Sequence, residues 1–157
     1  MACKKEIIKC NFYDSFKYKK RISQIVMKRD IDIASEISNI RKIENLIDEL
    51  SNELKINRDS YGKILVATLE AVNNAIIHGN KTDISKQVNV GFKLKEKSLN
   101  ITVKDEGTGF NPKIIPDPTS PENIENLHGR GVYLMNNLAD DIKFNPDGNQ
   151  VTMTFNL

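Results

Sequence analysis

The chain has 157 residues, of which 39% are apolar, 6% aromatic and 28% charged, so its size and composition are those of one soluble globular domain. The 23 basic and 21 acidic residues give a net charge of +2. No run of about 20 apolar residues could form a membrane-spanning helix, and the first residues lack the apolar core of a signal peptide. We therefore expect a cytoplasmic protein.

The positive charge is concentrated at the N-terminal end of the chain. Residues 1–29 hold nine Lys or Arg against two acidic residues, a net charge of +7, which leaves −5 for the rest. Residues 1–23 are a basic arm with aromatic side chains between its lysines. This arm could contact nucleic acid, or it could be a solvated tail or a strand that leads into the fold. The acidic remainder argues against a nucleic-acid-binding core.

The cysteines and histidines do not indicate a metal site. Cys3 and Cys10 both lie in the arm, and His78 and His128 are far apart in the sequence. This spacing is not that of zinc ligands, so we expect two free thiols.

Residues 24–157 are expected to form the folded domain, which begins with a strand and a helix. Alternating apolar residues indicate an edge strand over residues 24–33. Apolar residues at three- and four-residue steps then predict an amphipathic helix over residues 36–55, with Ser35 or Ser38 as its N-cap.

A second helix is predicted from Asp59, as N-cap, to about His78. Gly79 can end this helix in the left-handed conformation. The helix carries an apolar stripe made of Ile64, Leu65, Leu69, Val72, Ile76 and Ile77.

The second half of the chain predicts two hairpins separated by a loop and a short helix. These elements are strands around residues 88–94 and 99–103, a glycine-rich turn at 105–109, a proline-rich loop over 110–128, a helix over 132–140 and a final hairpin over 142–155. We take the loop as a lid, because such long segments in compact domains are more often functional than connective. The element order favours an α+β two-layer sandwich, with an antiparallel or mixed sheet and helices on one face.

The second helix carries a polar face in the middle of its apolar pattern. Glu70 and Asn74 are four residues apart, so their side chains project from one side of the helix, with Asn73 beside them. A carboxylate can act as a general base, and a carboxamide oxygen is a hard ligand that suits Mg²⁺. Taken alone, the pair could also be a solvated helix face.

Asp105 follows the second strand of the first predicted hairpin and is followed by Gly107 and Gly109. A carboxylate at this point can accept a hydrogen bond from an exocyclic amino group such as that of adenine, and the glycines would let a flat ring lie close to the backbone. The same composition is also typical of a plain turn.

Gly129, Arg130 and Gly131 precede the third predicted helix. Glycine backbone N–H groups and a helix N-terminus suit a phosphate, and an Arg can add a bidentate donor. A flexible loop with a solvated Arg is the alternative. The sequence has no P-loop motif and no dinucleotide-binding fingerprint after its first strand.

Three segments contain these residues in a fixed order: Glu70-Ala71-Val72-Asn73-Asn74-Ala75-Ile76-Ile77-His78-Gly79-Asn80, Asp105-Glu106-Gly107-Thr108-Gly109-Phe110 and Gly129-Arg130-Gly131-Val132-Tyr133-Leu134-Met135. They resemble the N, G1 and G2 boxes of the GHKL (histidine-kinase-like) ATPases. The small size and the first segment resemble the anti-sigma factor serine/threonine kinase branch in particular. The resemblance covers about residues 24–157.

The resemblance implies a mixed, mainly antiparallel sheet, helices on one face, ATP bound between helices, and a mobile ATP lid. It implies that Glu70 is the catalytic base, that Asn74 coordinates Mg²⁺ and that Asp105 binds the adenine amino group. The implied ATP-binding residues are Asn73, Asn74, His78, Asp105, Gly107, Gly109, Phe110, Gly129, Arg130, Gly131 and Val132.

The resemblance also implies partners. The kinase branch phosphorylates a Ser or Thr of an anti-anti-sigma (STAS-domain) protein, and otherwise sequesters a sigma factor or a similar transcription regulator. Its members are commonly dimers.

Other functions remain open from the sequence. One is a nucleotide-gated protein-binding switch without kinase activity, against which Glu70 argues because a pure binder needs no base. Another is the catalytic half of a sensor histidine kinase, for which the sequence shows no dimerisation helix with a phospho-accepting His. A nucleic-acid module that uses residues 1–23 is the remaining alternative.

Overall fold

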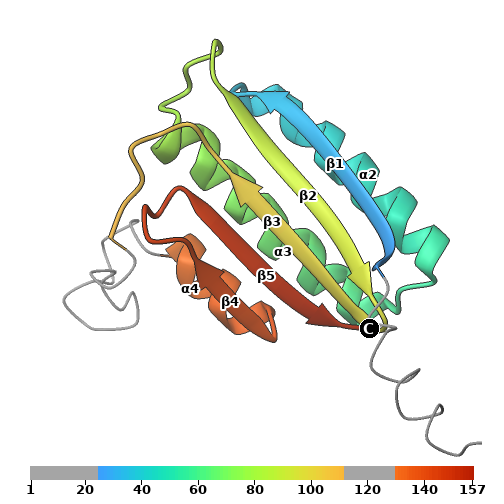
Figure 1. Cartoon of the computed structure of the whole chain (residues 1–157). Coiled ribbons are helices and arrows are strands. Elements are labelled where there is room, and N and C mark those ends of the chain that lie inside the picture. Colours follow the sequence, from blue (N-terminus) through green and yellow to red (C-terminus); the bar gives the residue numbers. More distant parts are fainter. Residues whose placement is uncertain (1–24, 112–129) are drawn as a thin grey trace, which may run out of the picture.

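The computed structural model of the chain describes residues 25–111 and 130–157. Five strands form one sheet in the order β1-β2-β3-β5-β4, and all four described pairings are antiparallel (Figure 1). The elements are β1 (Ile25–Ala34), the short 3₁₀ turn η1 (Ile37–Asn39), α2 (Ile40–Leu54), α3 (Arg58–Asn74), the π-helical turn η2 (Ala75–Gly79), β2 (Gln87–Lys95), β3 (Ser98–Lys104), α4 (Arg130–Leu138), β4 (Asp141–Phe144) and β5 (Gln150–Asn156).

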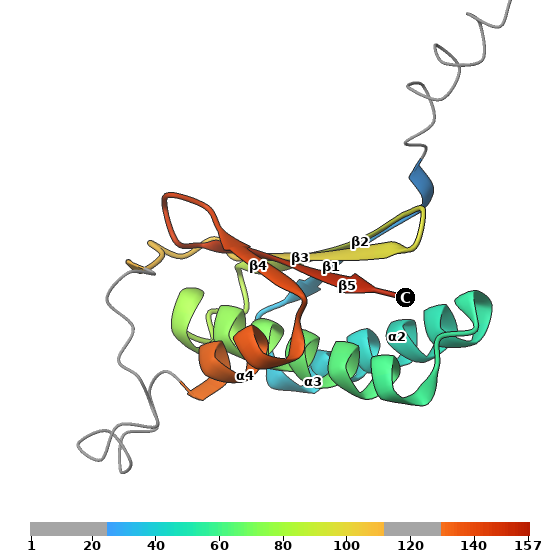
Figure 2. The same ribbon diagram turned by 90° about the horizontal axis from the view of Figure 1, so that it is seen from below.

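The helices cover one face of this sheet, as the view along the sheet shows (Figure 2). In strands β2, β3 and β5, buried residues alternate with half-buried or exposed ones, which turns one side of each of these strands toward the helices. The register aligns Val90 with Val103, and Val103 with Val151, and all three are buried. The predicted α+β two-layer sandwich is therefore confirmed, with a fully antiparallel sheet in the part of the chain that the structure describes.

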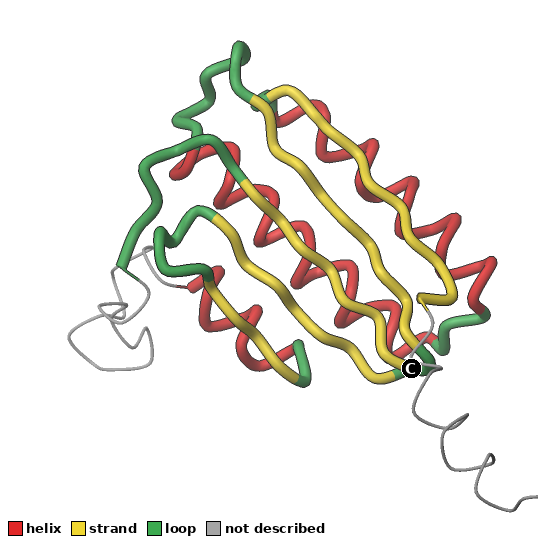
Figure 3. The backbone as a smooth tube through the Cα atoms, in the orientation of Figure 1, coloured by secondary structure: helices red, strands yellow, loops and turns green. Residues whose placement is uncertain are grey.

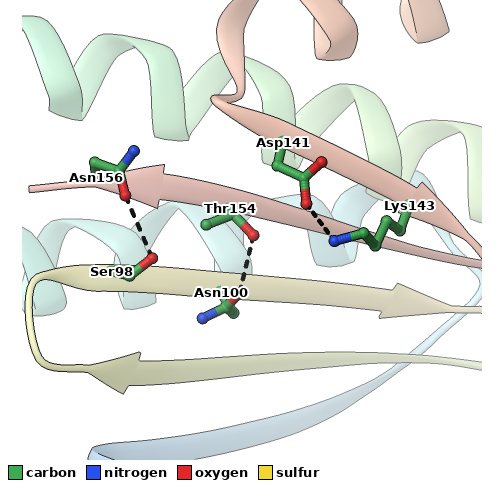
Figure 4. Close-up of polar contacts among 6 residues, drawn as sticks. All are labelled: Ser98, Asn100, Asp141, Lys143, Thr154 and Asn156. Atoms are coloured by element: carbon green, nitrogen blue, oxygen red, sulfur yellow. Dashed lines mark hydrogen bonds and ion pairs between the residues drawn. The ribbon is translucent and has the colours of Figure 1, made fainter.

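The opposite face of the sheet is polar. Thr154 Oγ1 on β5 donates to Asn100 Oδ1 on β3 at 2.9 Å, and within β4 Lys143 forms an ion pair with Asp141 at 2.6 Å (Figure 4). Thr102 and Thr152 form a further pair, with their hydroxyl oxygens 3.1 Å apart. Such a face is stable in water without a cover, so we look for the functional site on the helix side and at the strand ends.

The first strand and both of the long predicted helices are confirmed. The N-caps of the two helices are not those predicted. Asn39 stands before α2 without a side-chain cap hydrogen bond, and the buried Ser35 instead donates its hydroxyl to the carbonyl of Lys86. Asn57, and not Asp59, caps α3 by accepting the N–H of Ser60 at 2.9 Å. Capping depends on local backbone geometry, which the apolar period does not report.

The second long helix does not continue as a regular α-helix to His78. Regular α3 ends at Asn74, and the chain goes on as one π-helical turn before the loop that leads to β2, which is drawn green in Figure 3. Of the predicted stripe, Ile64, Val72 and Ile76 are buried, whereas Ile77 is exposed. Gly79 has no positive φ, so it does not end the helix in the left-handed conformation.

The described residues contain no helix that is both long and apolar enough to cross a membrane. The basic arm of residues 1–23 and most of the predicted lid, from 112 to 129, lie outside the described residues.

One buried group in α3 provides a test of the packing. Thr68 is fully buried, and its hydroxyl has no hydrogen-bond partner among the described residues. An unsatisfied buried hydroxyl costs about 1–3 kcal/mol. We therefore expect Thr68→Val, which keeps nearly the same shape, to raise the free energy of unfolding by about 1 kcal/mol in urea titrations.

Thr102→Val is the matched control, because Thr102 has a hydroxyl partner on the solvated face of the sheet. This control should lower stability or leave it unchanged. A Thr68→Val protein less stable than the unmodified chain would mean that the hydroxyl contributes to the fold.

Candidate functional site

Glu70 and Asn74 lie side by side on α3, and the backbone of α4 approaches both. Both side chains are half-buried. A methyl group added to Gly131 would lie 2.9 Å from Glu70 Oε2 and 2.9 Å from Asn74 Nδ2, which is closer than real side chains pack. Any larger residue at this position would displace the ends of the Glu70 and Asn74 side chains. The first and third predicted segments therefore meet at this contact.

The π-helical turn η2 connects Glu70 and Asn74 on α3 to a second group of residues around Asp105. In η2 the N–H of Asn80 donates to the carbonyl of Ala75 at 2.8 Å, five residues back. A π-helical turn inserted at the end of an α-helix is common at functional sites, because it changes the direction of the residues that follow it. Here it carries the chain from Asn74, on α3, to Gly79, at the end of the sheet.

Asp105 comes directly after β3, and its carboxyl group packs against Gly79. A methyl group on Gly79 would lie 2.5 Å from Asp105 Oδ1 and 2.7 Å from Oδ2, and a methyl group on Gly107 would overlap the carbonyl oxygen of Gly79. Both glycines are thus needed for close packing rather than for a left-handed turn. The backbone N–H of Asp105 donates to the carbonyl of Asn149 at 3.0 Å, which ties this loop to the start of β5.

Asp105 as a residue is only 9% exposed. Burial raises the pKa of Asp105 above its ordinary value, and the hydrogen bond from the N–H of Gly107, 2.8 Å from Oδ1, acts in the opposite direction. A half-satisfied buried carboxyl group at a strand end is costly in a free protein, and such groups are concentrated at functional sites.

The remainder of the Asp105 loop is held by the turn between β4 and β5. Gly109 has a φ of 71° and lies against the carbonyl of Asp147, while Gly148 has a φ of 72° and lies against the carbonyl of Phe110. The ring of Phe110 packs edge-on against that of Phe144, with centroids 5.5 Å apart. These two positive φ values bring the backbone around Gly109 close to the β4–β5 turn. Glycine allows them, whereas L-residues with a side chain rarely adopt them.

The structure places the predicted site residues in two groups. Glu70 and Asn74 meet Gly131, while Gly107 and Gly79 meet Asp105. Of the other predicted residues, Asn73 and Val132 are half-buried, whereas His78, Phe110 and Arg130 are exposed, and Gly129 lies outside the described residues.

Sequence reasoning missed the contribution of the β4–β5 turn to this site. Asp147, Gly148 and Asn149 were expected only to form the turn of the final hairpin, together with Pro146. The Asp-Gly pair in this turn was a signal for a positive φ at Gly148, but nothing in the sequence indicated what it would contact.

The described residues contain no group of three or more His, Cys, Asp or Glu side chains that could hold a metal ion. A Mg²⁺ ion that accompanies a nucleotide needs fewer protein ligands, because phosphate and water oxygens complete its shell. The side-chain oxygens of Asn74 and Glu70 are of the hard type that this ion prefers, so the residues present fit such an ion.

Comparisons with known proteins agree with this arrangement. The model of the histidine kinase-like ATPase domain matches residues 33–155. Serine-protein kinase RsbW of Oceanobacillus iheyensis is 31% identical over 102 residues, which are 61% of this chain and 65% of that protein. Serine-protein kinase RsbW of Bacillus mycoides is 30% identical over 134 residues, or 81% of this chain and 83% of that protein. The chain thus spans slightly less than two thirds of the Oceanobacillus relative.

A solved structure supports the fold. The crystal structure of the RsbU and RsbW domains of Rv1364c from Mycobacterium tuberculosis matches with a TM-score of 0.62 at 19% sequence identity. The match covers 84% of this chain and 32% of that one. At this identity the likeness concerns the fold alone.

The burial of Asp105 should make the free energy of unfolding depend on pH. Because the folded state raises the pKa of Asp105, ionisation of this group disfavours folding, and the loss of stability develops as the pH rises from about 4 through the folded-state pKa. Asp105→Asn removes this ionisation and keeps an oxygen for the N–H of Gly107. We expect the nucleotide-free variant to be at least as stable as the unmodified chain at pH 7, and to lose less stability than it does between pH 4 and pH 7.

Urea unfolding at several pH values measures this difference, with the exposed Asp147→Asn as control. A variant that is clearly less stable than the unmodified chain at pH 7 would show that the charged carboxyl group stabilises the fold.

Proposed function

Because the chain belongs to the histidine kinase-like ATPase domain family and, within it, to the branch of the RsbW serine-protein kinases, we propose that it is an ATP-dependent protein serine/threonine kinase of the anti-sigma type. It transfers the γ-phosphate of ATP to a Ser or Thr of an anti-anti-sigma (STAS-domain) partner in the cytoplasm. It otherwise sequesters a sigma factor or a similar transcription regulator. The observation that best supports this proposal is the contact of the Gly131 backbone with both Glu70 and Asn74.

In this proposal, Asp105 recognises the adenine. Its buried carboxylate accepts a hydrogen bond from the exocyclic amino group, which recovers part of the solvation that the carboxylate loses on folding. Gly107 and Gly79 leave no side chain between the loop and the π-helical turn. In this proposal the base lies beside this closely packed backbone, with Gly109 and Phe110 at the same end of the site.

The phosphates extend from Asp105 toward the start of α4. Backbone N–H groups around Gly129, Arg130 and Gly131 bind the phosphate oxygens, and the N-terminus of α4 favours their negative charge. Asn74 would hold Mg²⁺ through its side-chain oxygen, and the ion would neutralise charge on the phosphates.

Glu70 acts as the general base. Its carboxylate is half-buried and lies next to Gly131, on the side of α3 that faces the start of α4. It accepts the proton of the incoming Ser or Thr hydroxyl while that oxygen bonds to the γ-phosphorus, and ADP leaves. Positioning and electrostatic stabilisation by the site supply most of the remaining rate.

The role of Glu70 is tested by Glu70→Gln, which keeps the size and removes the base. We expect the variant to bind ATP nearly as the unmodified chain does, and to transfer phosphate to the STAS-domain partner at least about 100-fold more slowly. Incubation with labelled ATP and the partner measures transfer, and equilibrium titration measures binding.

Glu49→Gln on the exposed side of α2 is the control and should change neither quantity. Equal loss of binding and transfer in Glu70→Gln would refute the assigned role. An unmodified chain that binds ATP but transfers no phosphate would favour the nucleotide-gated switch instead.

The role of Asp105 predicts a loss of ATP affinity in Asp105→Asn. The carboxamide offers a weaker acceptor than a carboxylate, and we expect the dissociation constant for ATP to rise about tenfold or more. Asp59→Asn, at an exposed position in the first turn of α3 and outside both groups of site residues, should leave this constant unchanged. Unaltered ATP affinity in Asp105→Asn would contradict the adenine assignment, even if the variant is as stable as expected above.

A further inference from the structure

Asn80 is a buried carboxamide that none of the predicted roles includes. It follows the π-helical turn directly and is only 1% exposed. Its Nδ2 donates to Ser35 Oγ at 2.7 Å and to the carbonyl of Gln87 at 2.8 Å, and its Oδ1 accepts the backbone N–H of Glu106 at 2.8 Å. Both N–H groups of the carboxamide and its oxygen are therefore paired.

These hydrogen bonds join four separate segments at one end of the sheet. Ser35 follows β1, Gln87 begins β2 and Glu106 belongs to the loop after β3, while Asn80 itself follows η2. The network is closed by a further contact, because the carboxylate of Glu106 accepts the backbone N–H of Gln87 at 2.6 Å. Because every polar group of the buried Asn80 carboxamide is paired, the network holds these segments in one arrangement.

The network acts on the two residues that flank the Asp105 contact. Asn80 is the neighbour of Gly79, against which the Asp105 carboxyl group packs, and Glu106 is the neighbour of Asp105. The hydrogen bond from Glu106 N–H to Asn80 Oδ1 therefore joins the two residues that directly follow Asp105 and Gly79 in the chain. The hydrogen bond from Asp105 N–H to the carbonyl of Asn149 fixes the backbone of Asp105 next to β5, but it does not involve the Asp105 carboxyl group.

We propose that Asn80 is a positioning residue that fixes the Asp105 carboxyl group against Gly79 and so sets the selectivity of the site for a 6-aminopurine over a 6-oxopurine nucleotide. This inference rests on the proposed role of Asp105 in adenine recognition. Asn80 does not touch the nucleotide. It determines where the acceptor oxygen stands relative to the base, and a small displacement of that oxygen weakens a directional hydrogen bond.

The test compares Mg-ATP with Mg-ITP, which carries a carbonyl at position 6 where adenine carries the amino group. Titration calorimetry gives both dissociation constants for the unmodified chain, Asn80→Ala and Ser35→Ala. We expect the unmodified chain to bind ATP more tightly than ITP. In Asn80→Ala, the ratio of the ITP dissociation constant to the ATP dissociation constant should be about tenfold smaller than in the unmodified chain.

Ser35→Ala is the matched control, because it removes a buried polar partner from the same network and leaves the bond between Asn80 and Glu106 in place. It should lower the thermal midpoint but keep the ATP-to-ITP ratio of the unmodified chain. A purely structural role for Asn80 would lower stability in both variants and move the ratio in neither, which would overturn the inference.

The outcomes separate this inference from the proposed function. If the unmodified chain does not distinguish ATP from ITP, the adenine role of Asp105 fails, and the inference fails with it. If the unmodified chain distinguishes them and Asn80→Ala does so equally well, only the inference fails.

A measurement on the unmodified chain covers the case in which Asn80→Ala does not fold. The backbone N–H of Glu106 should be protected from hydrogen exchange, because its acceptor is the buried Asn80 carboxamide. Exchange at the rate of an unprotected loop amide would overturn the inference.

Discussion

The site depends on one close approach of two backbone segments at the end of the sheet. The carbonyl of Gly79 lies against Gly107, and the Asp105 carboxyl group lies against Gly79, so that neither glycine leaves room for a side chain. The position of Asp105 is set by β3, whose register is fixed between β2 and β5. The position of Gly79 is set by the packing of α3 on the sheet. The close approach joins the strand end that carries Asp105 to the helix that carries Glu70 and Asn74.

This arrangement holds the carboxyl group of Asp105 in a partly buried environment that disfavours its charged form. Burial raises the pKa of Asp105, which means that its charged form costs stability at neutral pH. Natural sequences retain such groups where function requires them. The surrounding backbone contacts, from Gly107 N–H and to Asn149 O, hold the residue in place but leave its carboxyl group without a full set of donors.

The sequence was sufficient to predict the strands and the long helices that the structure describes. Alternating and three- to four-residue apolar periods predicted the strands and the long helices, because burial of one face determines both patterns. The cap at Asn57 and the lack of a side-chain cap at the start of α2 were missed, since several polar residues near each helix start could serve equally well. The π-helical turn was also missed, because the residues from Ala75 to Gly79 have the composition of a continuing α-helix.

The contacts that assemble the site could not be predicted from the sequence. Gly79 was expected to end a helix, whereas its lack of a side chain accommodates the Asp105 carboxyl group. Asn80 lies within the first predicted segment, but its three partners come from segments between 7 and 45 residues away. Such contacts are set by the tertiary arrangement, and no local pattern in a single sequence encodes them.

The most direct test of the account is a calorimetric titration of the full chain with ATP, in the presence of Mg²⁺ and in the presence of excess EDTA. We expect binding with Mg²⁺, at least about tenfold weaker binding with EDTA, and little difference between the two conditions in an Asn74→Ala variant. The exposed Asn45→Ala variant should behave as the unmodified chain does. A folded chain that does not bind ATP, or that binds it equally well with EDTA, would contradict the account.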